Sequence, residues 1–211
     1  MKTLKKLIGV SMLTLCLLLT LFVPTTNVNA ASTRTKALTA YQKKLKKLDS
    51  KKYKFALVYF NKDSVPELLI TSTDEVHAIH GKLYTYTGGK VKVLKKAGSD
   101  FGELVYSAKK FVTCSLSWVN GYGLVSTFYR FDKNGKQTKI KRFDAVVNPT
   151  SSFKINGKKV SETKYNSEFK KMQKKYPLKQ ITPKKAFSLT TTNIKNLTKK
   201  YKSFVVTGSK Y

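Results

Sequence analysis

The chain has 211 residues, of which 42 are Lys or Arg and 11 are Asp or Glu, so its formal charge at neutral pH is +31. Charge of this sign and size favours anionic partners. Only three of the basic residues are Arg, and Arg is the side chain that best reads base edges, so the composition argues against sequence-specific nucleic-acid binding.

The first 30 residues have the pattern of a secretory signal peptide. Three lysines precede an uncharged run over residues 7–23, and Val28, Asn29 and Ala30 then end the segment with small residues that a signal peptidase accepts. A membrane anchor is the competing interpretation, but the run is short and interrupted by polar residues. We therefore expect cleavage after Ala30 and a secreted chain of charge +28, with association to the cell wall as a further possibility.

Cleavage would remove Cys16 and leave Cys114 as the only cysteine, so no disulfide is expected within the mature chain. Cys114 alternates with Val112 and Leu116 on one face of a predicted strand, which favours burial. A nucleophilic role would need a basic partner, and no histidine lies nearby in the sequence.

Residues 31–211 are expected to form a single domain, because no linker rich in Pro, Gly or Ser divides them. A helix is predicted over residues 36–48, where apolar residues recur at spacings of three and four and lysines take the other side. Residues 55–70 then predict two apolar strands joined by a polar turn at 61–64. Because both faces of the first strand are apolar, we expect this hairpin to be the central pairing of an antiparallel sheet.

Further hairpins continue the pattern. Gly88 and Gly89 join strands at 83–86 and 91–94, and longer strands are predicted at 110–118, 124–131 and 138–147. Ser161 is the expected N-cap of a helix that Pro177 ends, and another helical piece is expected at 194–201. The predicted fold is α+β: an antiparallel β-meander of about six to eight strands with an N-terminal helix and one or two C-terminal helices.

Segments 55–70, 83–86, 153–158 and 160–165 resemble a recurrent pattern in small secreted proteins of Gram-positive, clostridial-type bacteria. In that pattern the hairpin turn is an aspartate loop of the form Asp-x-Asp-x-Asp-Gly-x-Pro-Glu-Leu. The resemblance covers most of the mature chain. It implies export and this architecture, and it brings no assigned activity.

The aspartate loop of that pattern looks like a calcium loop, in which carboxylates two residues apart point into one small cavity. Here the loop is degenerate, because two of the three aspartates and the glycine are absent. Asn61, Asp63 and Glu67 remain as a weak candidate, and we expect no metal. The alternative is that the two carboxylates accept hydrogen bonds from the amides of the turn.

Two other places carry side chains that suit chemistry or recognition. The two histidines meet carboxylates only at Asp74, Glu75, His77 and His80, which is either a transition-metal site or a solvated connector. Tyr122, between two glycines, is a candidate for stacking on sugars. No Gly-rich phosphate loop or Cys/His cluster is present, so we expect neither catalytic residues nor a cofactor.

The basic residues are concentrated in the C-terminal part of the chain, where residues 133–211 hold 21 basic and three acidic residues. The predicted function is that of an exported, non-catalytic binding module that associates with anionic cell-surface polymer, such as teichoic acid or acidic polysaccharide. Alternatives are a small secreted hydrolase or enzyme inhibitor, binding to an anionic membrane surface, and an excess of lysine that serves solubility alone. The candidate binding residues are Lys136, Lys139, Lys141, Arg142, Lys164, Lys170, Lys171, Lys174 and Lys175.

Overall fold

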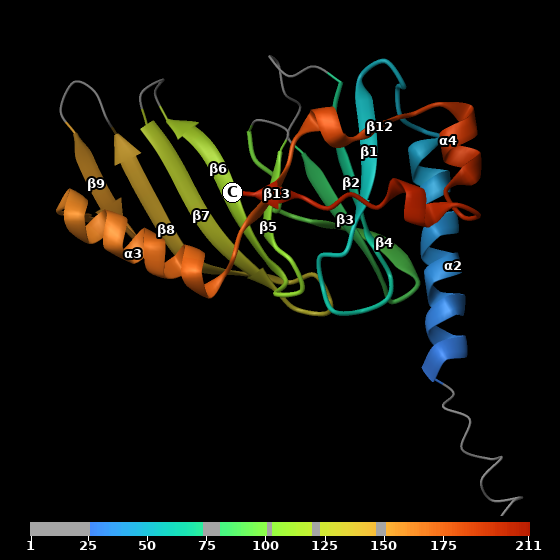
Figure 1. Ribbon diagram of the computed structural model, residues 1–211, viewed down its shortest axis with the longest axis horizontal. Coiled ribbons are helices and arrows are strands. Elements are labelled where there is room, and N and C mark those ends of the chain that lie inside the picture. Colours follow the sequence, from blue (N-terminus) through green and yellow to red (C-terminus); the bar gives the residue numbers. More distant parts are fainter. Residues whose placement is uncertain (1–25, 74–80, 101–102, 120–122, 147–150) are drawn as a thin grey trace, which may run out of the picture. The chain divides into compact units, whose positions relative to one another are not determined.

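The computed structural model describes residues 26–73, 81–100, 103–119, 123–146 and 151–211. Residues 1–25 of the predicted signal peptide lie outside them. The chain divides into two units, Met1–Ser32 and Thr33–Tyr211, and the second contains both β-sheets (Figure 1). The predicted α+β class with antiparallel sheet is confirmed, and the described strands form two sheets, of five and eight strands.

The five-stranded sheet has the order β12-β1-β2-β3-β4, with every pairing antiparallel. Strands β1 and β2 are the predicted hairpin, with Leu57 opposite Leu68. Strand β1 is internal, as its two apolar faces predicted, because β12 pairs with its other edge. The bounds of these strands are β1 (Tyr53–Val58), β2 (Glu67–Ser72), β3 (Lys82–Thr87), β4 (Lys90–Leu94) and β12 (Phe187–Ser188).

The eight-stranded sheet has the order β10-β9-β8-β7-β6-β5-β11-β13, again with antiparallel pairings. Its central strands β6, β7 and β8 correspond to the three long strands predicted from the sequence. The bounds are β5 (Leu104–Ser107), β6 (Val112–Val119), β7 (Gly123–Phe131), β8 (Gln137–Val146), β9 (Ser152–Ile155), β10 (Lys158–Val160), β11 (Lys179–Ile181) and β13 (Ser209–Lys210).

A β-bulge interrupts the pairing of β7 with β8. Lys141 lies opposite Phe128 and Lys139 lies opposite Tyr129, so Ile140 is the extra residue. Directly opposed residues share a face of a sheet, and the bulge therefore places Lys139 and Lys141 on different faces although they are two residues apart.

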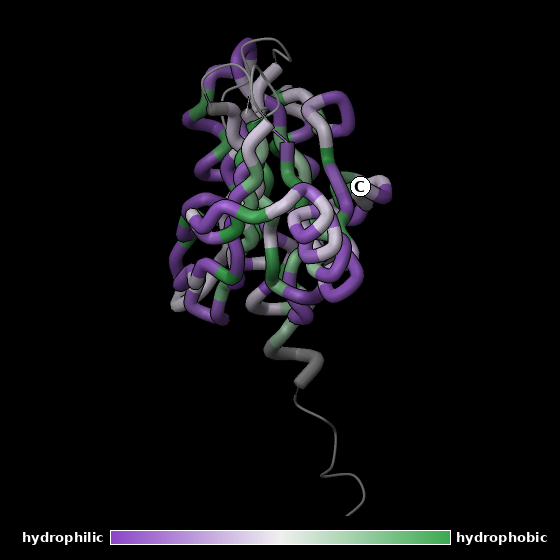
Figure 2. Tube along the Cα trace, turned by 90° about the vertical axis from the view of Figure 1, so that its left-hand side faces the viewer, coloured by the Kyte–Doolittle hydropathy of each residue, from purple (hydrophilic) through white to green (hydrophobic). Residues whose placement is uncertain are grey.

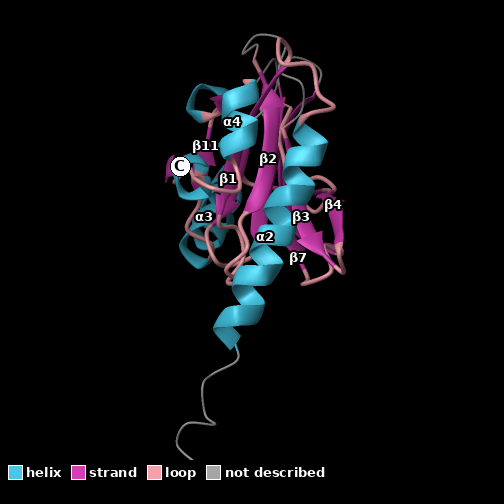
Figure 3. Cartoon of the chain, turned by 90° about the vertical axis from the view of Figure 1, so that its right-hand side faces the viewer, coloured by secondary structure: helices cyan, strands magenta, loops and turns pink. Residues whose placement is uncertain are grey.

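Helices cover one face of each sheet. Tyr41 of α2 (Thr26–Leu45) and Ile194 of α4 (Thr191–Asn196) share a hydrophobic cluster with Leu57 of the five-stranded sheet, and Figure 3 shows both helices lying over β1, β2 and β3. Helix α2 ends three residues before the predicted Leu48, and Thr190 caps α4 by accepting a hydrogen bond from the Asn193 amide at 3.0 Å. Two 3-10 turns, η1 (Pro183–Lys185) and η2 (Tyr201–Phe204), complete the C-terminal segment.

The two sheets pack against each other through a second cluster, in which Phe60 lies among residues of both sheets, including Leu69 and Phe131. Figure 2 shows hydrophobic stretches of the chain gathered in the interior and hydrophilic ones around the outside. Within the described residues, no helix combines the length and apolar character needed to cross a membrane.

Helix α3 (Glu162–Lys175) covers the other face of the eight-stranded sheet. Its predicted N-cap is confirmed, because the Ser161 hydroxyl accepts a hydrogen bond from the Lys164 amide at 3.3 Å. Tyr165 and Phe169 turn toward the sheet and meet the ring of Phe143 edge to face, with centroids 5.6 and 5.1 Å away. The lysines of α3 consequently point away from the sheet.

Candidate functional site

The lysines of α3 form an exposed surface, here called the α3 basic face: Lys164, Lys170, Lys171, Lys174 and Lys175. Lys170 and Lys174 are four residues apart, as are Lys171 and Lys175, and like charges at that spacing repel each other. The negative C-terminal end of the helix dipole offsets part of this repulsion. The helix therefore holds a concentration of positive charge that an anion would stabilise.

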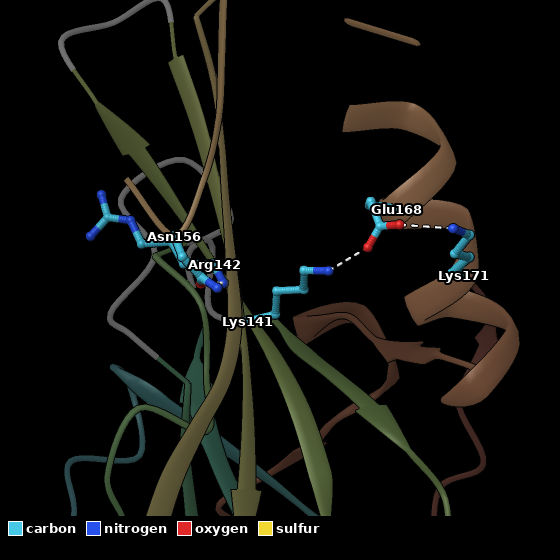
Figure 4. Close-up of polar contacts among 5 residues, drawn as sticks. All are labelled: Lys141, Arg142, Asn156, Glu168 and Lys171. Carbon is cyan, nitrogen blue, oxygen red and sulfur yellow. Dashed lines mark hydrogen bonds and ion pairs between the residues drawn. The ribbon is translucent and has the colours of Figure 1, made fainter. Parts of the chain in front are cut away.

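Glu168 is the one acidic residue of α3 that neutralises part of this charge. Its carboxylate accepts hydrogen bonds from the ammonium groups of Lys141, at 2.5 Å, and Lys171, at 2.8 Å (Figure 4). These two ammonium groups lower the pKa of Glu168 to about 2, so it is ionised throughout the ordinary pH range. Lys170 and Lys174 of the same helix have no ion-pair partner among the described residues.

The structure divides the predicted basic residues of β8 between two faces. Lys141 reaches toward α3, whereas Arg142 extends from the opposite side of the strand (Figure 4). Arg142 donates from Nε to Asp144 Oδ1 at 2.7 Å. Lys139 shares a face with Tyr129, and Lys136 lies in the turn before β8, where its amide donates to Asp132 Oδ1. The predicted set is thus not one continuous surface.

Arg142 belongs to a groove of about 540 Å³ that lies between the eight-stranded sheet and the segment around β4. Four exposed cations line this basic groove: Lys82, Lys95, Lys96 and Arg142. Hydroxyl groups line it as well, from Ser115, Ser117, Thr127 and Tyr129. Among the described residues that line the groove, Asp100 is the single acid.

Short contacts hold the segment after β4 against the eight-stranded sheet. Ser115 Oγ donates to the Gly98 carbonyl at 2.9 Å, and the Asp100 amide donates to the Leu116 carbonyl at 3.0 Å. A Cβ on Gly98 would lie 1.7 Å from the Gly81 carbonyl oxygen, so only glycine permits this approach. The ammonium group of Lys96 consequently lies 5.7 Å from the centre of the Tyr129 ring.

Sequence reasoning identified Arg142 but missed the three lysines of the groove. They lie 46 to 60 positions from Arg142 in the chain, and only the packing of one sheet against the other brings them together. One sequence signal of a polar face was available, namely the alternation in β6: Ser115 and Ser117 lie on the groove face, opposite the buried Cys114 and Leu116.

The degenerate aspartate loop is closed by its own hydrogen bonds. Asn61 Nδ2 donates to Asp63 Oδ2 at 2.8 Å and to Glu67 Oε1 at 2.9 Å, so an amide nitrogen lies between the two carboxylates. Asp63 and Glu67 also accept hydrogen bonds from the amides of Val65 and Phe60, which agrees with the turn-amide alternative. In the part of the chain that the structure describes, no three His, Cys, Asp or Glu residues gather where they could hold a metal ion.

The remaining candidates from the sequence are outside the site or outside the described residues. Asp74, Glu75, His77, His80 and Tyr122 all lie outside the described residues. Cys114 is fully buried, and burial raises the pKa of its thiol to about 12. Its sulfur is therefore a protonated core group, which confirms the predicted burial of this side chain.

Comparisons of the chain with protein-family models, with curated proteins and with solved structures found no match. Function is therefore inferred from the residues and their geometry alone.

Proposed function

We propose that this protein is an exported, non-catalytic module that associates with an anionic cell-surface polymer, such as teichoic acid or an acidic polysaccharide, through lysine-rich faces. The observation that carries the proposal is the α3 basic face, on which five exposed lysines share one 14-residue helix. The carboxylate of Glu168 forms ion pairs with Lys141 and Lys171. The other lysines of the α3 basic face can therefore bind an external anion.

Magnitudes favour a polymer over a small anion. An exposed ion pair contributes about 1 kcal/mol at most, so a lone anion on one lysine would be bound weakly. A polyanion engages several lysines together, and each contact after the first is intramolecular. Lysine suits this role because its flexible, hydrated ammonium group follows a mobile chain without fixed geometry.

The proposal is tested by retention on purified Gram-positive cell walls at increasing ionic strength. Retention should fall steeply as salt screens the attraction, and it should fall when teichoic acid is stripped from the walls. The triple variant Lys170→Gln/Lys174→Gln/Lys175→Gln should elute at lower salt than the parent protein. The matched control removes the same charge from exposed lysines of α2 and the turn after it: Lys43→Gln, Lys46→Gln and Lys47→Gln.

Three results would overturn the proposal. Retention on stripped walls could equal retention on intact ones, or the α3 and control variants could elute together. The third is stronger binding to anionic lipid vesicles than to intact walls, which would favour a membrane surface as the partner.

A further inference from the structure

We infer that the basic groove is a separate binding site, which takes a short segment of a hydroxyl-bearing phosphodiester chain. The groove lies on the face of the eight-stranded sheet opposite α3, so the site is distinct from the α3 basic face. The inference rests on the proposed function in one respect, since it assigns the repeating unit of the anionic polymer to this groove.

The first step is the distribution of charge. Lys82, Lys95 and Lys96 are exposed on one side of the groove, and Arg142 is exposed on the other. Asp144 accepts a hydrogen bond from Nε of Arg142 at 2.7 Å, which orients the guanidinium and leaves its two terminal nitrogens without a partner in the described residues. Against these four cations, the described part of the groove lining presents one acid, Asp100.

The second step is the floor. Ser115 pairs with Thr127, and Thr127 pairs with Arg142, so two hydroxyls and the guanidinium form a row across β6, β7 and β8. The Ser115 hydroxyl donates to the Gly98 carbonyl and can still accept a hydrogen bond from a sugar or polyol, and the groove hydroxyls of Ser117 and Tyr129 can donate as well as accept. A ligand that carries hydroxyls between its charges therefore matches this floor better than a purely ionic one.

The third step is continuity. A second hollow of about 190 Å³ shares Val125 and Arg142 with the groove and extends to Ser152 and Lys154 on β9. Lys154 lies opposite Asp144 in the sheet and is exposed. A chain can thus pass Arg142 and meet another cation beyond it, an arrangement that favours charges repeated along a polymer over a single free anion.

The fourth step concerns the kind of anion. Three of the four groove cations are lysines, which bind phosphate well as compact point charges, and the free edge of a guanidinium matches phosphate oxygens. A carboxylate glycan would be matched better by several guanidinium forks. Phosphodiester is therefore the assigned chemistry.

The test is calorimetric titration of the purified protein with a short glycerol phosphate oligomer. Arg142→Gln should weaken binding about fivefold and the double variant Lys95→Gln/Lys96→Gln about tenfold or more, because they remove one and two exposed charge contacts of about 1 kcal/mol each. Arg130→Gln is the matched control: Arg130 is an exposed arginine of the neighbouring strand that donates to the Tyr176 hydroxyl, away from the groove. This variant should bind the oligomer as the parent protein does.

Comparison ligands distinguish the possible sources of the anion. Inorganic phosphate should bind at least about tenfold more weakly than the oligomer, because several charge contacts act together in the oligomer. An oligogalacturonate of equal charge should also bind at least about tenfold more weakly, because the lysine-rich groove suits phosphate oxygens better than carboxylates. Equal binding of inorganic phosphate would reduce the groove to a small-anion site, and equal binding of the oligogalacturonate would remove the preference for phosphate. Either result, or unchanged affinity in Arg142→Gln, overturns the inference.

The two proposals fail separately. The α3 triple variant should bind the short oligomer normally while losing retention on walls. If the α3 triple variant kept its wall retention and the parent protein bound the oligomer, the proposed function would be overturned and the groove assignment would stand. If the α3 triple variant lost its wall retention but the parent protein did not bind the oligomer, the groove assignment would be overturned and the proposed function would stand.

Discussion

Replacement of Glu67 by Gln should remove a large pH dependence from the stability of this protein. Glu67 begins β2 and is only 1% exposed. Burial raises its pKa from 4.5 to about 8, and the charge of Asp63 adds to the rise, although hydrogen bonds from the Phe60 amide and the Thr85 hydroxyl oppose it. The folded protein therefore keeps a proton that the unfolded chain releases.

The sign and size of the effect follow from this difference. Below pH 4.5 both states hold the proton, and the full stability is present. As pH rises toward 8, the unfolded chain ionises while the folded protein resists, so the free energy of unfolding falls. Each pKa unit corresponds to about 1.4 kcal/mol, which gives about 5 kcal/mol across the window. A loss of that size is comparable with the whole stability of many domains.

The assay is urea denaturation at a series of pH values across this window, on the parent protein and on Glu67→Gln. Other carboxylates titrate in both proteins, so the difference between the two curves isolates Glu67. That difference should decline by about 1.4 kcal/mol per pH unit. Parallel curves would show that the folded and unfolded states bind the Glu67 proton equally, and would refute the reasoning.

Three further outcomes are expected from other parts of the structure. Glu168→Gln removes the carboxylate that neutralises Lys141 and Lys171, so the variant should elute from anionic walls at higher salt than the parent. Elution at the same salt would show that these two lysines do not contribute to wall binding. Phe143→Ala opens a cavity among three aromatic rings and should lower the free energy of unfolding by about 3–5 kcal/mol in urea titrations, whereas a loss below 1 kcal/mol would mean that the neighbouring rings collapse into the space. Cys114 should resist iodoacetamide in the native protein and react on unfolding, as measured by mass spectrometry, because its buried thiol is protonated; rapid native labelling would contradict this.

The parts of the fold that could be predicted from the sequence are those set by local pattern. The two apolar faces of β1 predicted an internal strand, and the Ser161 cap with the stripe of Tyr165 and Phe169 predicted α3. These signals lie within one turn or one strand, where side-chain periodicity and capping act directly. The short strands β5, β11 and β13 had no comparable pattern.

The groove depends on contacts between distant segments, which explains why the sequence did not reveal it. Lys95 and Lys96 follow a strand of one sheet, and Arg142 lies in the middle of the other. Their meeting requires the two sheets to pack and Gly98 to approach Gly81 closely. The burial of Glu67 was hidden in the same way: the sequence pattern marked it only as a carboxylate close to a polar turn, and the pairing of β2 with β3 places it beside Thr85.

The single extra residue in β8 decides which charges serve which surface. Deleting Ile140 would leave Lys141 opposite Phe128 and Lys139 opposite Tyr129 as consecutive residues of a regular ladder, so each lysine would keep its face. A regular ladder that retained Ile140 would instead shift the preceding residues by one position and bring Lys139 to the face of Lys141. The separation of these two charges therefore depends on Ile140 staying unpaired, and it would survive the loss of that residue.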